Sequence, residues 1–199
     1  MRKEVEELLT GEIPPVGTSL KRVFAGGSRR VTRLNADVRH RLDQIIQRQL
    51  GVLVGDANGA DKAIQKYLSD CHYLNVVVFC MAGECRNNVG GWPVRSVDSP
   101  HKVKDFTYYT AKDAAMARES EFGLMIWDGE SVGTMVNVAR LVSAGKPVVL
   151  YVLPKKVFYT LKTTTDLESM LSTSPRDVMT KVQRYIAEHA REFAQPTIF

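Results

Sequence analysis

The sequence predicts an α/β fold with a Rossmann-like, doubly wound and mostly parallel sheet that carries helices on both faces. Short apolar, β-branched segments alternate along the chain with segments of helical periodicity. The strand candidates are almost continuously apolar, which is typical of strands buried on both faces. Residues 121–152 form the clearest unit, because a strand, a turn, a helix and a second strand of this length favour a right-handed crossover between parallel strands.

Local residue patterns define the individual elements. Asn35 or Asp37 caps the first predicted helix. The five predicted strands are residues 21–25, 52–54, 75–80, 123–127 and 148–152. The predicted helices outside the central unit are residues 36–49, 60–68, 111–121, 162–172 and 177–193. The helix of the central unit has one apolar face, made up of Met135, Val138, Ala139 and Val142.

Changes in residue pattern divide the chain into three segments. Residues 1–20, a short polar helix and a turn-rich connector, are expected to be peripheral. Residues 21–154 carry the Rossmann-like domain. Residues 155–199 read as a C-terminal helical extension that packs on the domain or mediates self-association. We expect no chemistry in this extension.

Composition excludes some classes of protein. The chain of 199 residues is 44% apolar and 25% charged, as ordinary globular proteins are. It contains no apolar run near the roughly 20 residues of a membrane span, and its N-terminus lacks the apolar core of a signal peptide, so we expect a cytoplasmic protein. The net charge of +5 is spread along the chain, which disfavours a nucleic-acid partner and is compatible with a small anionic ligand.

The cysteines and histidines do not predict a metal site. Cys71, Cys80 and Cys85 are odd in number and lack the spacing of a zinc site, and the four histidines are dispersed. We expect buried or incidental thiols in a reducing compartment. No metal is expected.

Turns that contain glycine follow three of the predicted strands. They are residues 26–29, 55–61 and 129–134, and the last one precedes a helix. Ligands of open α/β sheets collect at the C-terminal ends of the strands, where a helix N-terminus also favours a phosphate. We therefore expect these turns to converge on one ligand site. Its candidate residues are Gly26, Gly27, Ser28, Arg29, Gly55, Asp56, Asp128, Gly129, Ser131, Gly133 and Thr134.

Two of these turns also have a simpler explanation. The glycines of residues 129–134 can serve only the geometry of a tight turn. Asn58 and Asp61 can be residues of a helix start instead of ligand contacts. Asp56, the residue expected to hold a ribose or a base, and Asp128 form a possible carboxylate pair. There is no Gly-Lys-Ser/Thr sequence, so the last turn is not a Walker A loop.

Residues 82–110 have no regular pattern. Their aromatic and cationic side chains suit a wall or lid over a nucleotide-like ligand, with Arg86 and Trp92 as the leading lid residues. The alternative, an extra edge strand at residues 93–97, is equally compatible with the sequence. The other residues that suggest a lid are Arg95, His101, Lys102, Lys104, Phe106, Tyr108 and Tyr109.

From about residue 21 to 152 the chain resembles the SLOG superfamily, the Rossmann-like group that includes the cytokinin-activating LOG proteins and the DprA-like and YspA-like proteins. The resemblance is carried by GGSR at 26–29, by GDANGAD at 55–61, which is similar to the YspA-type turn, and by the helix, strand and Gly-Thr turn at 111–137. It implies a nucleotide or nucleotide-derived ligand along the C-terminal edge of the strands. Members of the superfamily often form homodimers, so it also implies a homo-oligomer, and the nucleotide-type ligand is the one cofactor-like molecule that it suggests.

Two positions depart from the LOG pattern. Where hydrolytic LOG proteins have an arginine on the helix and a glutamate after Gly-Thr, this chain has Lys112 and Asn137. Asn137 cannot ionise, so it cannot serve as a nucleophile or a carboxylate base. The resemblance therefore implies nucleotide binding without LOG-type hydrolysis.

Two other functions remain open. One is an N-glycosidase, a deoxyribosyltransferase-like or a phosphoribohydrolase-like enzyme with a relocated carboxylate, for which Asp128, Glu130 and Glu119 are candidates. Asp128 and Lys112 are the weak catalytic candidates in such an enzyme. The other is a scaffold whose turns are purely structural.

Overall fold

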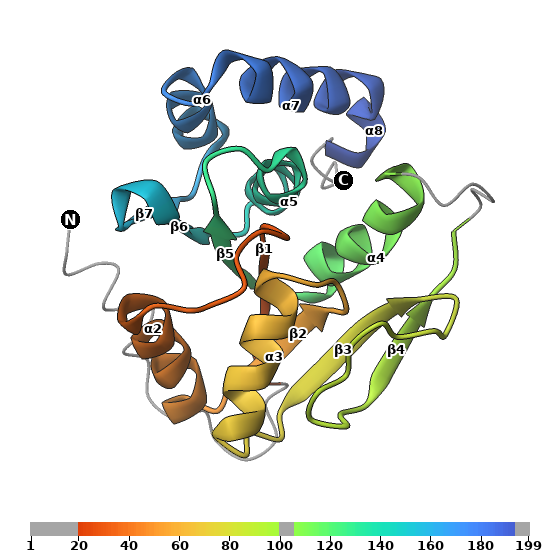
Figure 1. Cartoon of the computed structure of the whole chain (residues 1–199). Helices are drawn as coiled ribbons and strands as arrows, with labels where there is room; N and C mark the ends of the chain where they lie inside the picture. Colours follow the sequence, from red (N-terminus) through yellow and green to blue (C-terminus); the bar gives the residue numbers. More distant parts are fainter. Residues whose placement is uncertain (1–19, 100–105, 194–199) are drawn as a thin grey trace.

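A seven-stranded sheet forms the centre of the computed structural model, which describes residues 20–99 and 106–193 (Figure 1). The spatial order of the strands is β4-β3-β2-β1-β5-β6-β7. All neighbours pair in parallel except β6 and β7, which pair antiparallel. The strands are β1 (Arg22–Gly27), β2 (Gly51–Gly55), β3 (Val76–Met81), β4 (Val94–Val97), β5 (Phe122–Trp127), β6 (Val148–Val152) and β7 (Val157–Leu161).

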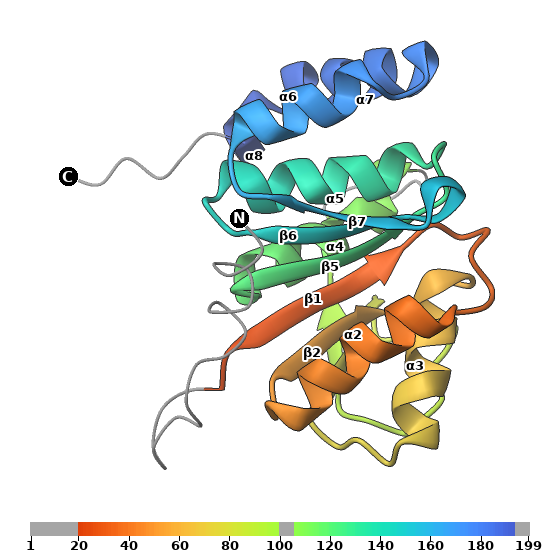
Figure 2. The ribbon, with the colours of Figure 1, turned by 90° about the vertical axis from the view of Figure 1, so that its left-hand side faces the viewer.

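Helices cover both faces of the sheet, which confirms the predicted fold class. Helices α2 and α3 lie on one face, α4 and α5 lie on the other, and α6 and α7 form a further layer outside α5 (Figure 2). The helical segments are α2 (Ala36–Gln47), α3 (Ala60–Asp70), α4 (Phe106–Glu119), α5 (Val132–Ser143), the 3₁₀ turn η1 (Leu153–Lys155), α6 (Thr164–Ser172), α7 (Arg176–Glu188) and α8 (Ala190–Phe193).

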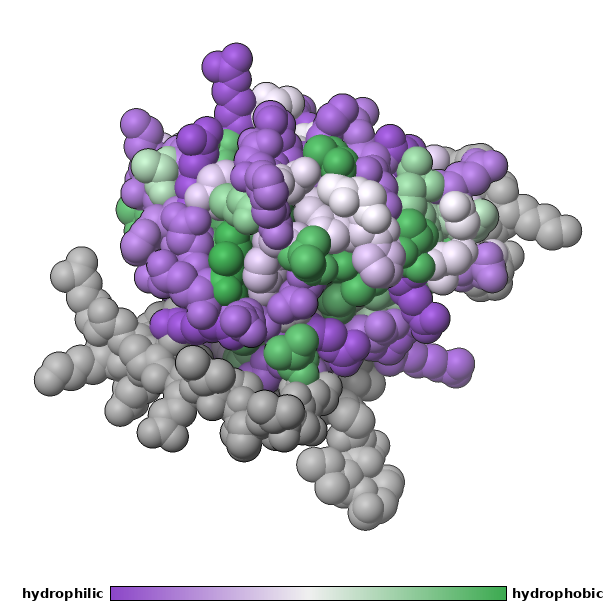
Figure 3. All heavy atoms as spheres, turned by 90° about the horizontal axis from the view of Figure 1, so that it is seen from below, coloured by the Kyte–Doolittle hydropathy of each residue, from purple (hydrophilic) through white to green (hydrophobic). Residues whose placement is uncertain are grey.

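Each face of the sheet has its own hydrophobic core. Leu42 of α2 and Ile64 of α3 are fully buried against one face. Met135 and Val138 of α5 are buried against the other. The outward residues of α2 and α3 are mostly hydrophilic. Figure 3 shows one side of the molecule, where hydrophobic residues lie in small groups between hydrophilic ones.

Helix α5 is buried all around rather than on the one predicted face. Val136 and Leu141 are as buried as the residues that the periodicity assigned to the core. The reason is the outer layer, because Leu167 of α6 and Val182 of α7 belong to the same hydrophobic cluster as α5. The C-terminal helices are therefore part of the domain core.

The five predicted strands are all present, and two further strands lie at the edges of the sheet. Strand β4 agrees with the edge-strand alternative for residues 93–97. Strand β7 was not predicted; it pairs with β6, so the sheet continues into the range assigned to the helical extension. Helix α4 begins five residues before its predicted start at 111. The predictions for residues 1–19, His101, Lys102 and Lys104 lie outside the described residues.

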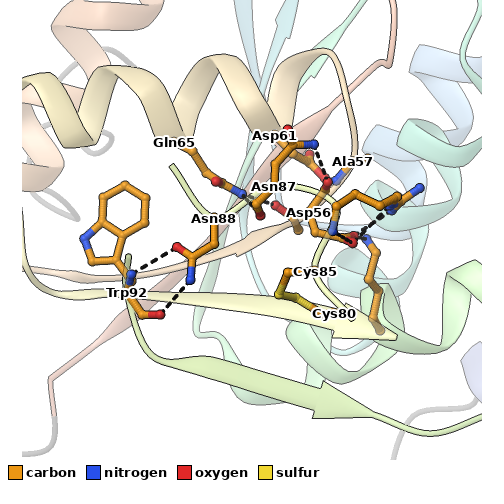
Figure 4. Close-up of a disulfide and its surroundings, with 12 residues drawn as sticks. Asp56, Ala57, Asp61, Gln65, Cys80, Cys85, Asn87, Asn88 and Trp92 are labelled. Atoms are coloured by element: carbon orange, nitrogen blue, oxygen red, sulfur yellow. Dashed lines mark hydrogen bonds and ion pairs between the residues drawn. A yellow bond between two sulfur atoms is a disulfide. The ribbon is translucent and has the colours of Figure 1, made fainter. Parts of the chain in front are cut away.

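Cys80 and Cys85 form a disulfide, so the expectation that all three cysteines are thiols is wrong for this pair. Strand β3 ends beside Cys80, and a turn with left-handed backbone at Ala82 and Gly83 brings the chain back. The turn places the two Cα atoms 5.0 Å apart (Figure 4). Cys71 is a free, exposed thiol.

None of the helices in residues 20–99 and 106–193 has the length and apolarity to cross a membrane.

The strand order reverses beside β1. The chain moves outward from β1 through β2 and β3 to β4, and then returns to place β5 on the other side of β1. Such a reversal opens a crevice outside the carboxyl ends of the two strands. Gly27 permits the close approach there, because a methyl group at this position would lie 2.2 Å from the carbonyl oxygen of Ile126.

We expect Gly27→Ala to lower the free energy of unfolding by about 2 kcal/mol or more, because the strands cannot separate without loss of pairing. Gly51→Ala is the control, since its methyl group would meet the Cγ atom of the half-buried Arg22 side chain at 3.0 Å, and that side chain can move. Urea unfolding of both variants measures the difference. Equal losses would contradict the steric role of Gly27.

Candidate functional site

A cavity of about 570 Å³ lies at the carboxyl ends of β1 and β5, where the strand order reverses. Four segments line it: the end of β1 with the turn after it, the turn after β2 with the start of α3, the first half of α4, and the turn before α5 with the first half of α5. Its volume is in the range of small-molecule sites, roughly 300–1,000 Å³. The expected convergence of several turns on one crevice is therefore present in the structure.

Most of the predicted site residues face or border this cavity, but those of the second turn do not. Gly55 and Asp56 are absent from its lining, whereas Ala57 and Asp61 of the same turn take part in it. Ser28 is fully buried behind the wall, and Gly129, in left-handed conformation, is also absent from the lining. The predicted residues that line the cavity are Gly26, Gly27, Arg29, Asp128, Ser131, Gly133 and Thr134.

Asp128 organises the turn before α5. Its Oδ1 atom accepts hydrogen bonds from the backbone N–H of Glu130 at 3.0 Å and of Ser131 at 2.8 Å. The hydroxyl group of Ser28 donates to the same oxygen at 3.0 Å. Asp128 thus fixes the shape of the turn, and this use of its carboxylate does not favour the catalytic role that the sequence suggested.

The start of α5 has two backbone donors that point out of the helix. Ser131 caps the helix, because its side chain accepts the N–H of Thr134 at 3.4 Å. The N–H groups of Val132 and Gly133, in the first turn, have no acceptor within a helix. Both residues line the cavity. An anion placed there would be stabilised by these donors and by the helix dipole.

Two cations lie close to an aromatic ring of the cavity lining. The guanidinium of Arg29 lies 5.9 Å from the centre of the Tyr109 ring, and that of Arg86 lies 5.0 Å from it. Arg29 and Tyr109 both line the cavity. Arg30 also lines it and forms an ion pair with Glu130 across the opening.

Lys112 provides a buried positive charge in the wall formed by α4. It is 3% exposed, and its ammonium group lies 2.7 Å from Asp113 Oδ1 and 3.9 Å from Asp56 Oδ1. Burial acts to lower the pKa of Lys112, but the neighbouring carboxylates outweigh burial and raise it above its ordinary value. Lys112 therefore remains charged at neutral pH, which argues against a role as nucleophile or base.

Asp61 is a buried carboxyl group in the cavity wall. It is 7% exposed, and burial raises its pKa to about 6 although the charge of Lys112 acts in the opposite direction. Gly55 leaves room for these two groups, because a methyl group there would lie 2.4 Å from Asp61 Oδ2 and 2.8 Å from Lys112 Nζ. The predicted importance of Gly55 is thus steric.

Asp56 is occupied by Arg86 and does not reach the cavity. It is 2% exposed and accepts hydrogen bonds from the Arg86 side chain at 2.6 and 3.0 Å and from the backbone N–H of Arg86 at 3.1 Å. Burial acts to raise the pKa of Asp56, but these hydrogen bonds and the charge of Lys112 lower it overall. Arg86 therefore clamps the turn after β2, and Asp56 is not free to hold a ribose as predicted.

Trp92 is buried, which contradicts its predicted role as a lid. Its side chain is 6% exposed, and its indole N–H donates to the backbone oxygen of Tyr73 at 2.8 Å. Asn88 bonds to both the backbone N–H and the backbone oxygen of Trp92 (Figure 4). The tryptophan anchors the start of β4 to the core instead of covering the cavity.

Asp113 is a cavity residue that the sequence analysis missed. Its Oδ2 atom accepts a hydrogen bond from the amide of Asn137 at 3.1 Å. Asn137 in turn accepts one from Arg140 at 2.8 Å, and Arg140 also donates to the hydroxyl group of Tyr185 in α7 at 2.8 Å. The carboxylate follows Lys112 directly on the helix, and this adjacency was the signal that could have indicated it. The C-terminal helices, from which we expected no chemistry, thus support the site.

The other two candidates for a relocated carboxylate are not positioned for that role. Glu119, at the end of α4, pairs with Arg22 and Arg95 and is absent from the cavity lining. Glu130 is at the opening in its ion pair with Arg30. Within the described part of the chain, no cluster of three or more His, Cys, Asp or Glu side chains is suited to a metal ion.

Comparison of the chain with models of protein families and with curated proteins gave no match. The resemblance to the SLOG superfamily therefore stays a proposal. The function has to be inferred from the geometry of the cavity.

We expect Arg86→Ala to lower the free energy of unfolding by about 3 kcal/mol, because it leaves the buried Asp56 carboxylate without its main partner. Arg95→Ala removes an exposed ion pair with Glu119 at 3.5 Å and should cost less than about 1 kcal/mol. Chemical denaturation at pH 7 measures both. A loss for Arg86→Ala as small as that for Arg95→Ala would refute the clamp.

The raised pKa of Asp61 predicts a pH-dependent effect of Asp61→Asn. The pKa of Asp61 is higher in the folded than in the unfolded state, so the folded wild type binds the proton more tightly. The free energy of unfolding of the wild type therefore falls as the pH rises from about 4 through about 6. Asparagine does not titrate, so the stability of the variant relative to the wild type should increase across this interval. Unfolding curves at pH 4.5 and 7.5 test this, with Asp70→Asn on the exposed side of α3 as control. A difference that stays constant with pH would show that Asp61 is not held in its neutral form.

Proposed function

We propose that the protein is a SLOG-like, YspA-like domain that binds a nucleotide or a nucleotide-derived small molecule in the cavity between β1 and β5. The observation that carries the proposal is the convergence of the turn after β1 and the first turn of α5 on one cavity at the strand reversal. Open α/β sheets bind their ligands at this place.

The phosphate would lie against the N–H groups of Val132 and Gly133. Gly27 lines the cavity beside this helix start, and Arg29 supplies a positive charge. The hydroxyl groups of Ser131 and Thr134, 3.0 Å apart, stand at the same helix start. Together these groups offer donors at the phosphate position. The two carboxylates of the preceding turn are already engaged, Asp128 by the N–H groups of Glu130 and Ser131 and Glu130 by Arg30.

The opposite wall suits the rest of a nucleotide. Tyr109 presents an aromatic ring that can stack on a base. Asp61 and Asp113 present carboxyl groups to the hydroxyl or amino groups of a sugar or base. Asn137, bonded to Asp113 and Arg140, replaces the ionisable residue of LOG-type hydrolases, so binding without LOG-type hydrolysis is the proposed activity.

Calorimetry and thermal-shift measurements with AMP, ADP-ribose, NAD and cyclic nucleotides test the proposal. At least one nucleotide should bind and stabilise the protein, and Arg29→Ala should weaken its binding about tenfold, as expected for loss of one charged contact. Arg39→Ala, an exposed arginine of α2 outside the cavity lining, is the matched control and should leave the dissociation constant unchanged. If none of the nucleotides binds, the proposal fails.

One observation favours a second candidate, an N-glycosidic hydrolase or transferase with a relocated carboxylate. Asp113 lines the cavity, and Asn137 orients its carboxylate from the position where LOG enzymes have glutamate. Such an enzyme would release free base from a nucleoside or its monophosphate.

We expect Asp113→Asn to abolish this release if the second candidate is correct, because the amide cannot act as nucleophile or base. Glu119→Gln, at the far end of the same helix, should retain the activity. Chromatography of the products measures it. If the wild type releases no base from any nucleotide that it binds, binding without catalysis remains.

Homodimer formation and cytoplasmic location also stay predictions.

A further inference from the structure

Asp61 has an oxygen atom that the protein leaves for a ligand. Its Oδ2 atom accepts the N–H of Ala57 at 3.3 Å. Within the described residues no group donates a hydrogen bond to its Oδ1 atom, although the residue is more than nine-tenths buried. The nearby ammonium group of Lys112 is paired with Asp113 at 2.7 Å instead. This oxygen is not among the enclosed side-chain atoms that lack a partner in the described residues, so it is open to the cavity, where the donor of a ligand can reach it.

The free oxygen is directed towards the end of β1. A methyl group on Gly26 would lie 3.2 Å from Asp61 Oδ1, and Gly26 lines the same cavity. Gly27, the next residue, borders the proposed phosphate position at the start of α5. The proposed anion position and the Asp61 acceptor therefore lie on either side of two consecutive glycines. A compact molecule that carries both a phosphate and a hydroxyl group can reach both.

We propose that Asp61 is the specificity-determining acceptor of this cavity, and that the ligand is a phosphorylated sugar, such as the ribose 5′-phosphate part of a nucleotide, whose hydroxyl group donates to Asp61 Oδ1. This inference rests on the proposed function and deepens it. It assigns the ribose to Asp61, whereas the sequence had suggested Asp56, and it leaves Asp56 to its ion pair with Arg86.

The surroundings of Asp61 favour the sugar hydroxyl over a second anion. Asp56 and Asp113 place two more carboxyl groups close to the same ammonium group. Arg86 offsets Asp56, which lies outside the cavity lining, but Asp61 and Asp113 both line the cavity and share the single charge of Lys112, so this wall would repel a second phosphate. A neutral group that donates hydrogen bonds is the chemistry that this wall accepts.

The affinities of AMP, 2′,3′-dideoxy-AMP and inorganic phosphate test the inference by calorimetry. The wild type should bind AMP at least tenfold more tightly than the dideoxy analogue, because a hydrogen bond to a charged group is lost. Asp61→Ala should bring the two nucleotides to the same affinity while its affinity for inorganic phosphate stays that of the wild type. Asp61→Asn, which keeps the shape of the side chain, is the second variant in case the alanine variant does not fold.

The outcomes separate the two proposals. If AMP and the dideoxy analogue bind the wild type equally, the role of Asp61 is refuted while nucleotide binding stands. If the Asp61 variants weaken both nucleotides and phosphate alike, the residue is structural and the inference is again refuted. If neither AMP nor phosphate binds the wild type, the proposed function fails and the inference with it.

The Cys80–Cys85 disulfide carries a second, independent inference. Arg86 follows Cys85 directly and holds Asp56, while Asn87 donates to the backbone oxygen of Asp56 at 2.8 Å (Figure 4). These bonds join the turn after β3 to residues 55–61, the segment that contributes Ala57 and Asp61 to the cavity wall. We infer that this disulfide forms and breaks reversibly, and that the backbone of residues 55–61 is better ordered when the disulfide is formed.

Thiol–disulfide exchange with a small disulfide such as oxidised glutathione provides a balanced route. Cys85 is half-buried and Cys80 fully buried, so the Cys85 thiolate attacks the glutathione disulfide first and releases one glutathione thiolate. The Cys80 thiolate then attacks the mixed disulfide at the Cys85 sulfur and releases the second. The protein loses two protons and two electrons, which the two glutathione molecules take up.

Hydrogen exchange in oxidised and reduced glutathione buffers tests the switch without any ligand. The backbone amides of residues 57–61 should exchange at least threefold faster in the reduced protein, and Cys85→Ser should show the fast rate in both buffers. Cys71→Ser, which removes the exposed free thiol, should respond as the wild type does. Equal exchange in both buffers, or three free thiols in the oxidised protein, would overturn the inference.

Discussion

The buried ammonium group of Lys112 is the charge on which the arrangement of the site depends. Asp56, Asp61 and Asp113 come from two different segments, and their carboxyl groups gather around this cation in the interior. Like charges cannot share a buried place unless an opposite charge or a proton offsets them. Lys112 pairs with Asp113 and Arg86 pairs with Asp56, whereas Asp61 has no ion pair within the described residues, and burial raises its pKa to about 6. Gly55 makes the arrangement sterically possible.

This charge distribution gives the cavity two chemically different sides. The side formed by the start of α5 and the turn after β1 offers backbone donors and Arg29, while its own carboxylates, Asp128 and Glu130, are engaged by backbone N–H groups and by Arg30. The side formed by α4 and the start of α3 offers the carboxyl groups of Asp113 and Asp61. A molecule that is anionic at one end and rich in hydroxyl groups at the other matches both sides. The C-terminal helices belong to the same system, since Tyr185 and Arg140 hold the Asn137 side chain that contacts Asp113. Removing these helices would therefore disturb the site as well as the core.

Much of the fold follows from local sequence patterns, and much of the site does not. Five apolar strands and the turns that follow them are evident because periodicity and glycine placement are local properties. Strand β7 was missed although its sequence, VFYTL, is β-branched, aromatic and apolar, because the change of pattern after Pro154 was interpreted as the start of a helical extension. The roles of Asp56 and Trp92 were wrong because their partners Arg86 and Tyr73 are distant in sequence. Asp113 became evident only when α4 was placed beside α5.

The central claim is that an anionic group of the ligand lies against the first turn of α5. Titration of isotope-labelled protein with AMP, followed by the backbone amide resonances, tests it most directly. The account predicts that the Val132 and Gly133 amides shift most, together with that of Gly27, and that inorganic phosphate moves the same amides in the same direction. Shifts confined to other parts of the surface, with the amides of Val132 and Gly133 unchanged at saturation, would contradict it.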